Sequence, residues 1–315
     1  MKVQRKLTII IVMVLLTVVA LGTSTYAWFT LNNIAKVDQI EMGITSGVGI
    51  DLSLDKKNWY SELSSEELKS VTEGVKFDAV TSLNGETFAT MDNNAVQVAD
   101  KKYIEFTMYF RATNVLALEN VEAGIFLVGN NNNATYNNLG STTAIVSEGR
   151  KWNPDTTFEY EPNNILSPES SEMICYAKDA IRLSFTYNQT TTDQTTTIFD
   201  LSSDSGNESY KGYGYEYGAI SYYKSKKGIK QLVAPGKQSV VFRNELSIID
   251  SQSVTANNNN SLITKLVLDT NDNNYYGETV IRIWIEGWDG DCFDSILSDK
   301  VKAQLKFQFG QLSSN

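Results

Sequence analysis

Carboxylates and two cysteines are among the residue types of this chain that could do chemistry. The 315 residues include 37 aspartates and glutamates and no histidine. Without imidazole there is no Ser-His-Asp or Cys-His catalytic unit, no HExxH zinc protease motif and no histidine-ligated metal. Two carboxylates about 5–10 Å apart can hydrolyse a glycosidic bond, but nothing in the sequence selects a pair. We therefore expect no enzyme activity, no cofactor and no metal site.

The densest run of functional residue types lies between residues 284 and 292. Trp284 and Trp288 are four apart with Glu286 between them, which on one face of a strand could form a platform for stacking a sugar. The favoured interpretation is that both tryptophans fill a core, because residues 280–285 are apolar on both faces, as in a central strand. Residues 289–291 would then be the turn that ends this strand.

Two other runs have open interpretations. Six tyrosines between residues 210 and 223 are interleaved with glycine; they suit either an adaptable binding loop or an edge hairpin whose rings cover the rim of the core. Residues 269–274, together with Glu278, offer oxygen ligands at alternate positions, but the run lacks the glycine and glutamate that a calcium-binding EF-hand needs. A hairpin turn is therefore the favoured interpretation of 269–274.

The N-terminus predicts export. Three basic residues precede an apolar run over 7–21, and small residues follow it up to Ala27. This is the pattern of a secretory signal peptide, which predicts cleavage after Ala27, or one residue later after Trp28. The alternative for residues 1–27 is an uncleaved membrane anchor. In either case the body, residues 28–315, is expected to be secreted or held on the extracellular face of the cell envelope.

The residues around this site resemble those of the TasA/camelysin group. Residues 25–30 read TYAWFT, and after a polar segment residues 45–54 read TSGVGIDLSL. The resemblance covers about the first 55 residues. It implies a secreted, Gram-positive cell-surface or biofilm-matrix protein that is released by a SipW-type signal peptidase. It also implies a jelly-roll opened by the Ser-Gly-containing strand.

Cys175 and Cys292 are predicted to form a disulfide. Disulfides persist outside the cytoplasm, and the two cysteines of this chain are enough to form one. Cys175 precedes a predicted strand over 181–187, and Cys292 follows one over 280–288. If these strands are antiparallel neighbours, the thiols lie close together. The alternative is two separate buried thiols, because free cysteine packs as a small hydrophobe.

The charge of the chain limits its partners. The formal net charge is −10, and loss of the signal peptide would make it more negative. An acidic surface repels nucleic-acid phosphate and anionic lipid, so we expect no nucleic-acid partner and membrane contact only through residues 7–29. The expected partners are other copies of the chain, other surface or matrix proteins, and the signal peptidase during export.

Alternating hydrophobicity predicts an all-β body. In residues 103–111 the apolar side chains recur at every second position, which indicates a half-buried strand. The same period recurs in 181–187, 281–285 and 301–309, and weaker strands are predicted over 44–54, 120–128, 195–201, 217–223, 229–233, 238–249 and 262–268. Only Ser64 to Ser70 and a short turn after Cys292 are expected to be helical.

Strands at this density, without a βαβ rhythm, predict an antiparallel jelly-roll or β-sandwich with long polar loops. A hydrophobic signal or anchor helix is expected to precede it. The region 130–170 holds three of the four prolines and is where an insertion into the single β-sandwich domain would lie.

The segment freed by cleavage is predicted to mediate assembly. Trp28, Phe29 and Leu31 open residues 28–44, in which apolar residues continue at intervals of three. A sandwich with an open edge could accept this segment from a neighbour as an added strand, and such head-to-tail contacts would propagate into a fibre. Alternatively, the segment forms the first strand of its own sheet or a membrane tether.

These observations predict an exported, non-enzymatic surface or matrix protein that can form fibres. The competing class is an adhesin or binding module for a glycan or protein, and a carboxylate-based hydrolase is a distant third.

Overall fold

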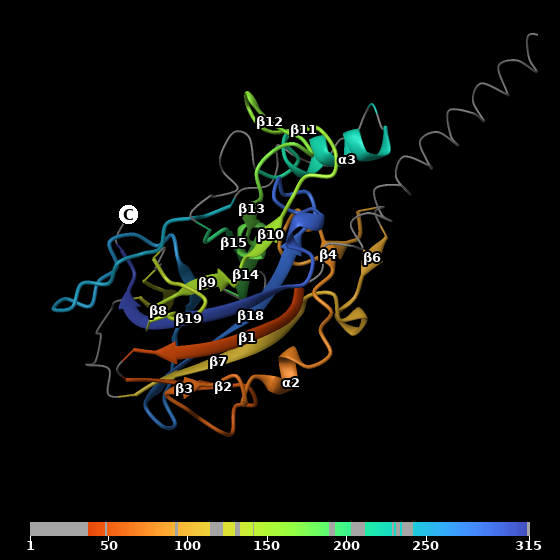
Figure 1. Ribbon diagram of the computed structural model, residues 1–315. Coiled ribbons are helices and arrows are strands. Elements are labelled where there is room, and N and C mark those ends of the chain that lie inside the picture. Colours follow the sequence, from red (N-terminus) through yellow and green to blue (C-terminus); the bar gives the residue numbers. More distant parts are fainter. Residues whose placement is uncertain are drawn as a thin grey trace, which may run out of the picture.

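Strands dominate the structure, as predicted (Figure 1). The computed structural model describes residues 37–313, except 48, 92–93, 114–121, 130–132, 141, 189–192, 203–211, 229, 231–233 and 235–241. Within these residues the strands form two large sheets and three two-stranded ones.

The first sheet has six strands. Its order is β16 (Leu262–Lys265), β8 (Ala123–Leu127), β19 (Asp299–Gln311), β1 (Val37–Ser46) and β3 (Glu62–Leu63), with β9 (Ala144–Ser147) also paired to β19.

The second sheet has seven strands. Its order is β15 (Gln194–Phe199), β14 (Ile181–Asn188), β18 (Asn274–Glu286), β7 (Ile104–Ala112) and β2 (Ile50–Ser53), with β17 (Val267–Asp269) and β4 (Ala79–Val80) also paired to β18.

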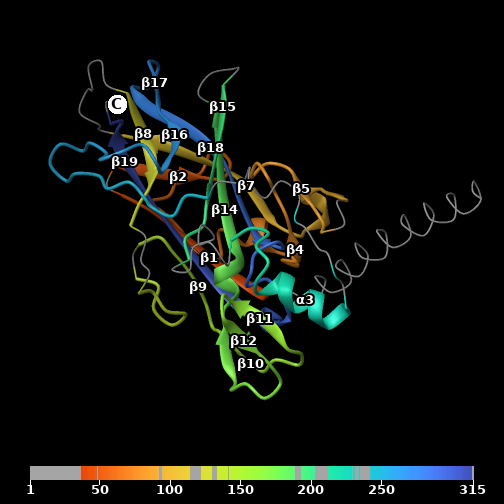
Figure 2. The same cartoon turned by 90° about the horizontal axis from the view of Figure 1, so that it is seen from above.

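Smaller elements complete the described part. The two-stranded sheets are β5 (Phe88–Ala89) with β6 (Ala95–Val96), β10 (Arg150–Trp152) with β13 (Met173–Cys175), and β11 (Phe158–Glu161) with β12 (Asn164–Leu166). The helices are α2 (Lys69–Thr72), α3 (Ala219–Lys227) and the 3₁₀ turns η1 (Val98–Asp100), η2 (Ala177–Ala180) and η4 (Asp294–Ile296). The turn η4 confirms the helical turn predicted after Cys292. Figure 2 places β10–β12 and α3 at the opposite end of the molecule from β8, β16 and β17.

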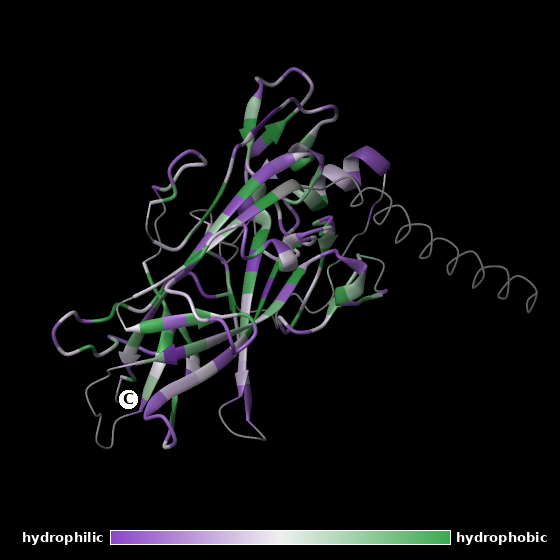
Figure 3. Ribbon diagram, turned by 90° about the horizontal axis from the view of Figure 1, so that it is seen from below, coloured by the Kyte–Doolittle hydropathy of each residue, from purple (hydrophilic) through white to green (hydrophobic). Residues whose placement is uncertain are grey.

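The two large sheets share one hydrophobic core. Phe307 of β19 packs edge-to-face against Phe110 of β7, at 5.2 Å between ring centroids, and against Phe185 of β14, at 6.2 Å. Buried and less buried residues alternate along β7 and most of β19, and Figure 3 shows the matching hydrophobic and hydrophilic bands along the long strands. The period of two read from the sequence therefore places one side of each strand in this core.

The expectation of purely antiparallel sheets is wrong. β1 and β19 run parallel, from Val37 opposite Asp299 to Ser46 opposite Phe307, and β4 is parallel to β18. Parallel neighbours need a long crossover connection, and here almost the whole chain separates β1 from β19. Side-chain alternation is the same for both strand directions, which is why the sequence pattern did not reveal the direction.

Three weaker predictions also fail or shift. Residues 217–223 form no strand, because α3 begins at Ala219; its last turn carries three lysines, which favour a helix C-terminus, and Gly228 ends it in the left-handed conformation. The helix expected over 64–70 occurs later, at Lys69–Thr72. The described part of 238–249 forms only isolated bridges, and nearly all of 229–233 lies outside the described residues.

Candidate functional site

The predicted cleavage and assembly residues at the N-terminus lie outside the described part of the chain. These are Ala27, Trp28, Phe29 and Leu31. The later part of the predicted assembly segment is described, and it corrects one expectation. Residues 37–44 are not available for donation, because they form most of β1 within the first sheet of their own subunit. Among the described helices, none is long and apolar enough to cross a membrane.

The strand β1 has one edge that is mostly unpaired. β19 covers its other edge from Val37 to Ser46, whereas β3 pairs only with Ile44 and Thr45. On the edge of β1 that faces β3, no described strand pairs with Val37–Gly43. Met42 and Ile44 are buried in the core, so the strand is fixed in place. Unpaired N–H and C=O groups on such an edge are a template for another strand, which makes this edge the candidate assembly site.

The predicted disulfide is not formed. Both cysteines are buried, and neither takes part in a disulfide. The strand pairing from which the disulfide was inferred is correct, because β14 is antiparallel to β18 with Ile181 opposite Ile285. Cys175, however, lies in β13, which pairs with β10 and is separated from β14 by η2, and Cys292 lies in the turns beyond β18. The two thiols therefore pack separately, as in the alternative interpretation.

Both tryptophans of residues 284–292 belong to the core, which is the interpretation that the sequence favoured. Trp284 is fully buried and Trp288 is 4% exposed. Glu286 lies between them and is also fully buried. It accepts hydrogen bonds from the Trp284 Nε1–H at 3.0 Å and the Trp288 backbone N–H at 3.2 Å. Burial raises the pKa of Glu286 to about 7.

A buried arginine joins the strands next to Glu286. Arg182 of β14 has no exposed surface and forms ion pairs with Asp200, at 3.1 Å, and with Asp289. Its Nη1 donates to the carbonyl oxygens of Asp179 and Ile181, each at 3.0 Å. Because these charges are enclosed, the cluster fixes β14 to the turn after β18 rather than meeting a ligand. Sequence reasoning missed it, since Arg182 alternates with core residues and would be expected to face solvent.

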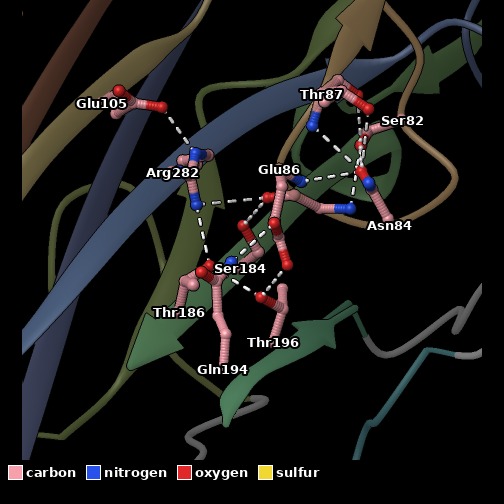
Figure 4. Close-up of polar contacts among 11 residues, drawn as sticks. Ser82, Asn84, Glu86, Thr87, Glu105, Ser184, Thr186, Gln194, Thr196 and Arg282 are labelled. Carbon is pink, nitrogen blue, oxygen red and sulfur yellow. Dashed lines mark hydrogen bonds and ion pairs between the residues drawn. The ribbon is translucent and has the colours of Figure 1, made fainter. Parts of the chain in front are cut away.

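A polar network covers part of the outer face of the second sheet (Figure 4). Arg282 donates to Glu105 at 2.5 Å and to the Thr186 hydroxyl at 2.8 Å, and Thr196 donates to Glu86 at 2.5 Å. The Ser184 hydroxyl donates to the Gly85 carbonyl at 2.6 Å. Arg282 Nη1 also lies 3.5 Å from the Gly85 carbonyl oxygen, so these contacts fasten the loop 82–87 onto β14, β15 and β18.

The described part of the tyrosine run, residues 212–223, is neither an exposed loop nor an edge hairpin, and Tyr210 lies outside the described residues. Tyr213, Tyr222 and Tyr223 are buried, and the last two belong to α3. The Tyr222 hydroxyl lies 2.7 Å from the Asp294 carboxylate and 3.0 Å from that of Asp155. Burial and these carboxylates raise the pKa of Tyr222. The cluster holds α3 on the body.

The suspected cation loop is a hairpin turn. The Asn273 N–H donates to the Asp269 carbonyl at 2.9 Å, and the Asp269 carboxylate accepts the Asn271 N–H at 2.8 Å. Glu278 forms an ion pair with Lys56 at 2.8 Å instead of joining the turn. The described residues contain no group of three or more Cys, Asp or Glu side chains placed to hold a metal ion.

Comparisons with known proteins do not assign the chain to a family. No family model matches it, and searches among curated proteins and solved structures return no match.

Proposed function

We propose that the chain is an exported, non-enzymatic structural protein of the cell surface or extracellular matrix, and that its copies join by strand addition. This function is what the TasA/camelysin resemblance implies for residues 25–54. The proposal includes release by a signal peptidase after Ala27 or Trp28, membrane contact only through residues 7–29 before release, and a jelly-roll arrangement of the two sheets.

The observation that supports assembly is the unpaired edge of β1. Val37–Gly43 present backbone groups without a described partner on one side, and the segment 28–36, which carries Trp28, Phe29 and Leu31, lies directly before them in sequence. A segment of this length extends to about 30 Å, whereas pairing along 37–43 requires about 23 Å. Residues 28–36 of one subunit are therefore long enough to cover this edge of another.

Side chains would give the contact its specificity. In an added strand the backbone supplies hydrogen bonds, and alternate side chains fill pockets beside the edge. The large apolar residues of the donor segment are Trp28, Phe29, Leu31 and Ile34, and the first three lie at its start. Such a contact joins different surfaces of two subunits, so it does not close on itself and extends into a filament.

Deletion of the donor segment tests this proposal. We expect protein 28–315 to form filaments in electron micrographs and fast-sedimenting species, and protein 37–315 to remain monomeric. A control with Trp28, Phe29 and Leu31 replaced by serine keeps the length and should also assemble poorly, because the pocket-filling groups are lost. Filaments of equal abundance in all three proteins, or none in protein 28–315 at high concentration, would reject strand donation by this segment.

A further inference from the structure

A cleft crosses the outer face of the second sheet near the start of β18. It encloses about 510 Å³, within the range of about 300–1,000 Å³ typical of small-molecule sites. Four aromatic residues line it, Trp59, Tyr109, Tyr276 and the core residue Phe110, together with polar groups that include Glu278 and Asn188. The loop 82–87 covers a different part of this face, so the cleft remains open beside it.

Strand register brings these side chains together. Tyr109 of β7 lies opposite Glu278 of β18, and Arg111 lies opposite Tyr276. Residues two apart on a strand share a face, so all four side chains lie on the outer face. Trp59 comes from the loop after β2; its ring lies 4.7 Å from the Arg111 guanidinium and 6.0 Å from the Tyr276 ring.

The loop that carries Trp59 is held by its own hydrogen bonds. The Asp55 carboxylate accepts the backbone N–H groups of Lys57 and Asn58, each at 2.8 Å, and these bonds, led by that from Asn58, lower the pKa of Asp55. Leu52 and Tyr60 exchange backbone hydrogen bonds of 2.7 and 2.9 Å on either side of the loop. The indole is therefore positioned before any ligand arrives, which reduces the entropy lost on binding.

Charges at the cleft are balanced. Lys56 is paired with Glu278 at 2.8 Å, and Lys265 with Glu122 at 2.8 Å. Arg111, under the indole, is paired with Asp51 at 2.7 Å. A strongly charged ligand would therefore meet cations and carboxylates together, and the cleft favours a neutral ligand with many hydrogen-bonding groups.

We propose that this cleft binds a neutral carbohydrate of one or two sugar rings. The aromatic rings of Trp59 and Tyr276 would pack against the C–H face of a sugar, since aromatic side chains supply large apolar contact surface. The carboxylate of Glu278 accepts, and the amide of Asn188 both donates and accepts, hydrogen bonds from hydroxyl groups. A proline-rich peptide also docks on aromatic grooves, but the polar groups around these rings suit hydroxyl groups better.

Fluorescence titration of the secreted protein tests this site. The probes are neutral di- and trisaccharides of glucose, mannose, galactose and N-acetylglucosamine, with a uronic-acid trisaccharide and a proline-rich decapeptide as comparators. We expect at least one neutral saccharide to bind saturably. Trp59→Ala and Tyr276→Ala should each weaken binding at least tenfold. The matched control is Tyr60→Ala, because Tyr60 is 41% exposed and adjacent but does not line the cleft; it should bind normally.

Two milder variants keep the test valid if an aromatic substitution unfolds the protein. Glu278→Gln and Asn188→Ala change exposed side chains and should weaken saccharide binding several-fold with unchanged melting temperature. The proposal is overturned if no neutral saccharide in the panel binds, or if binding is unaffected by both the Trp59 and Glu278 substitutions. Tighter binding of the decapeptide than of any saccharide would also overturn it.

Discussion

Glu286 is a side chain whose surroundings conflict with its ordinary charge. It is fully buried beside Trp284, and Arg182 with its two ion-paired aspartates lies close enough to influence it electrostatically. A carboxylate in such a place is costly to ionise, which is why its pKa rises from 4.5 to about 7. The chain has no histidine, so no imidazole titration overlaps with that of Glu286.

This residue gives the protein a defined pH dependence. Between pH 4.5 and about 7 the folded state binds the Glu286 proton more tightly than the unfolded state, so the free energy of unfolding decreases as pH rises through this window. The decrease attributable to Glu286 is about 3 kcal/mol. Burial raises the pKa of Asp289 as well, against the opposing charge of Arg182, and this adds to the same trend.

Glu286→Gln should therefore make the free energy of unfolding less dependent on pH. We expect the variant to unfold at higher denaturant concentration than the natural protein at pH 8, and the difference to shrink at pH 5. Urea unfolding at five pH values between 4.5 and 8 measures this. Glu148→Gln, at a side chain 52% exposed, is the control and should keep the natural profile. An unchanged slope in Glu286→Gln would show that Glu286 does not titrate near neutrality in the fold.

At the scale of the elements, the loop 82–87 depends on a close backbone approach. Gly85 has a φ of +72°, and a Cβ there would lie 2.8 Å from Ser184 Cβ and 2.9 Å from Ile198 Cγ1. A side chain at this position would push the loop away from β14 and β15. Only glycine adopts this left-handed backbone conformation readily and also leaves room for Ser184 and Ile198 at this distance.

Gly85→Ala should therefore be destabilising by about 2–4 kcal/mol, from the left-handed backbone and overpacking together. Gly74→Ala is the matched control, since Gly74 has a similar φ of +75° but no atom within 4 Å of the added Cβ; it should cost only about 1 kcal/mol. Thermal unfolding of the two variants compares them. Equal losses of stability in the two variants would mean that loop 82–87 does not pack closely against β14 and β15.

Elements also show how far the sequence predicts this fold. Alternating side chains identify β7, β14, β18 and β19, because each has one face in the shared core. The same pattern misleads around residues 217–223. Tyrosines alternate with glycine and glutamate over 213–218, but the helix α3 follows directly from Ala219. Helical spacing buries Ala219, Tyr222 and Tyr223 there, so tertiary packing decides the outcome.

The sequence did not predict two features of the candidate sites, the absence of a disulfide and the aromatic cleft, because both depend on contacts between residues far apart in the chain. Cys175 and Cys292 flank strands that do pair, yet they form no disulfide; Cys175 belongs to β13, and Cys292 lies in the turns beyond β18. Trp59, Tyr109 and Tyr276 are distant in sequence, and only the register of β7 with β18 and the turn after β2 bring them to one cleft. Neither outcome can be read from spacing along the chain.

At the scale of the whole molecule, we propose that one subunit adds a strand to β1 of the next. We propose different roles for two surface regions, the β1 edge in assembly and the aromatic cleft in sugar binding, while the polar network of a third region holds loop 82–87 on the second sheet. The first two can be tested separately, because the cleft lies on the outer face of the second sheet whereas β1 belongs to the first.

Hydrogen exchange of backbone amides in assembled and monomeric protein is the most direct test. We predict that, in filaments of protein 28–315, amides of Val37–Gly43 on the unpaired edge become strongly protected, since a new strand accepts their hydrogen bonds. Amides of Gln194–Thr197, on the outer edge of β15, are the internal control and should exchange equally in both states. Unchanged exchange over Val37–Gly43 in filaments would contradict the claim, because subunits would then be joined through another surface.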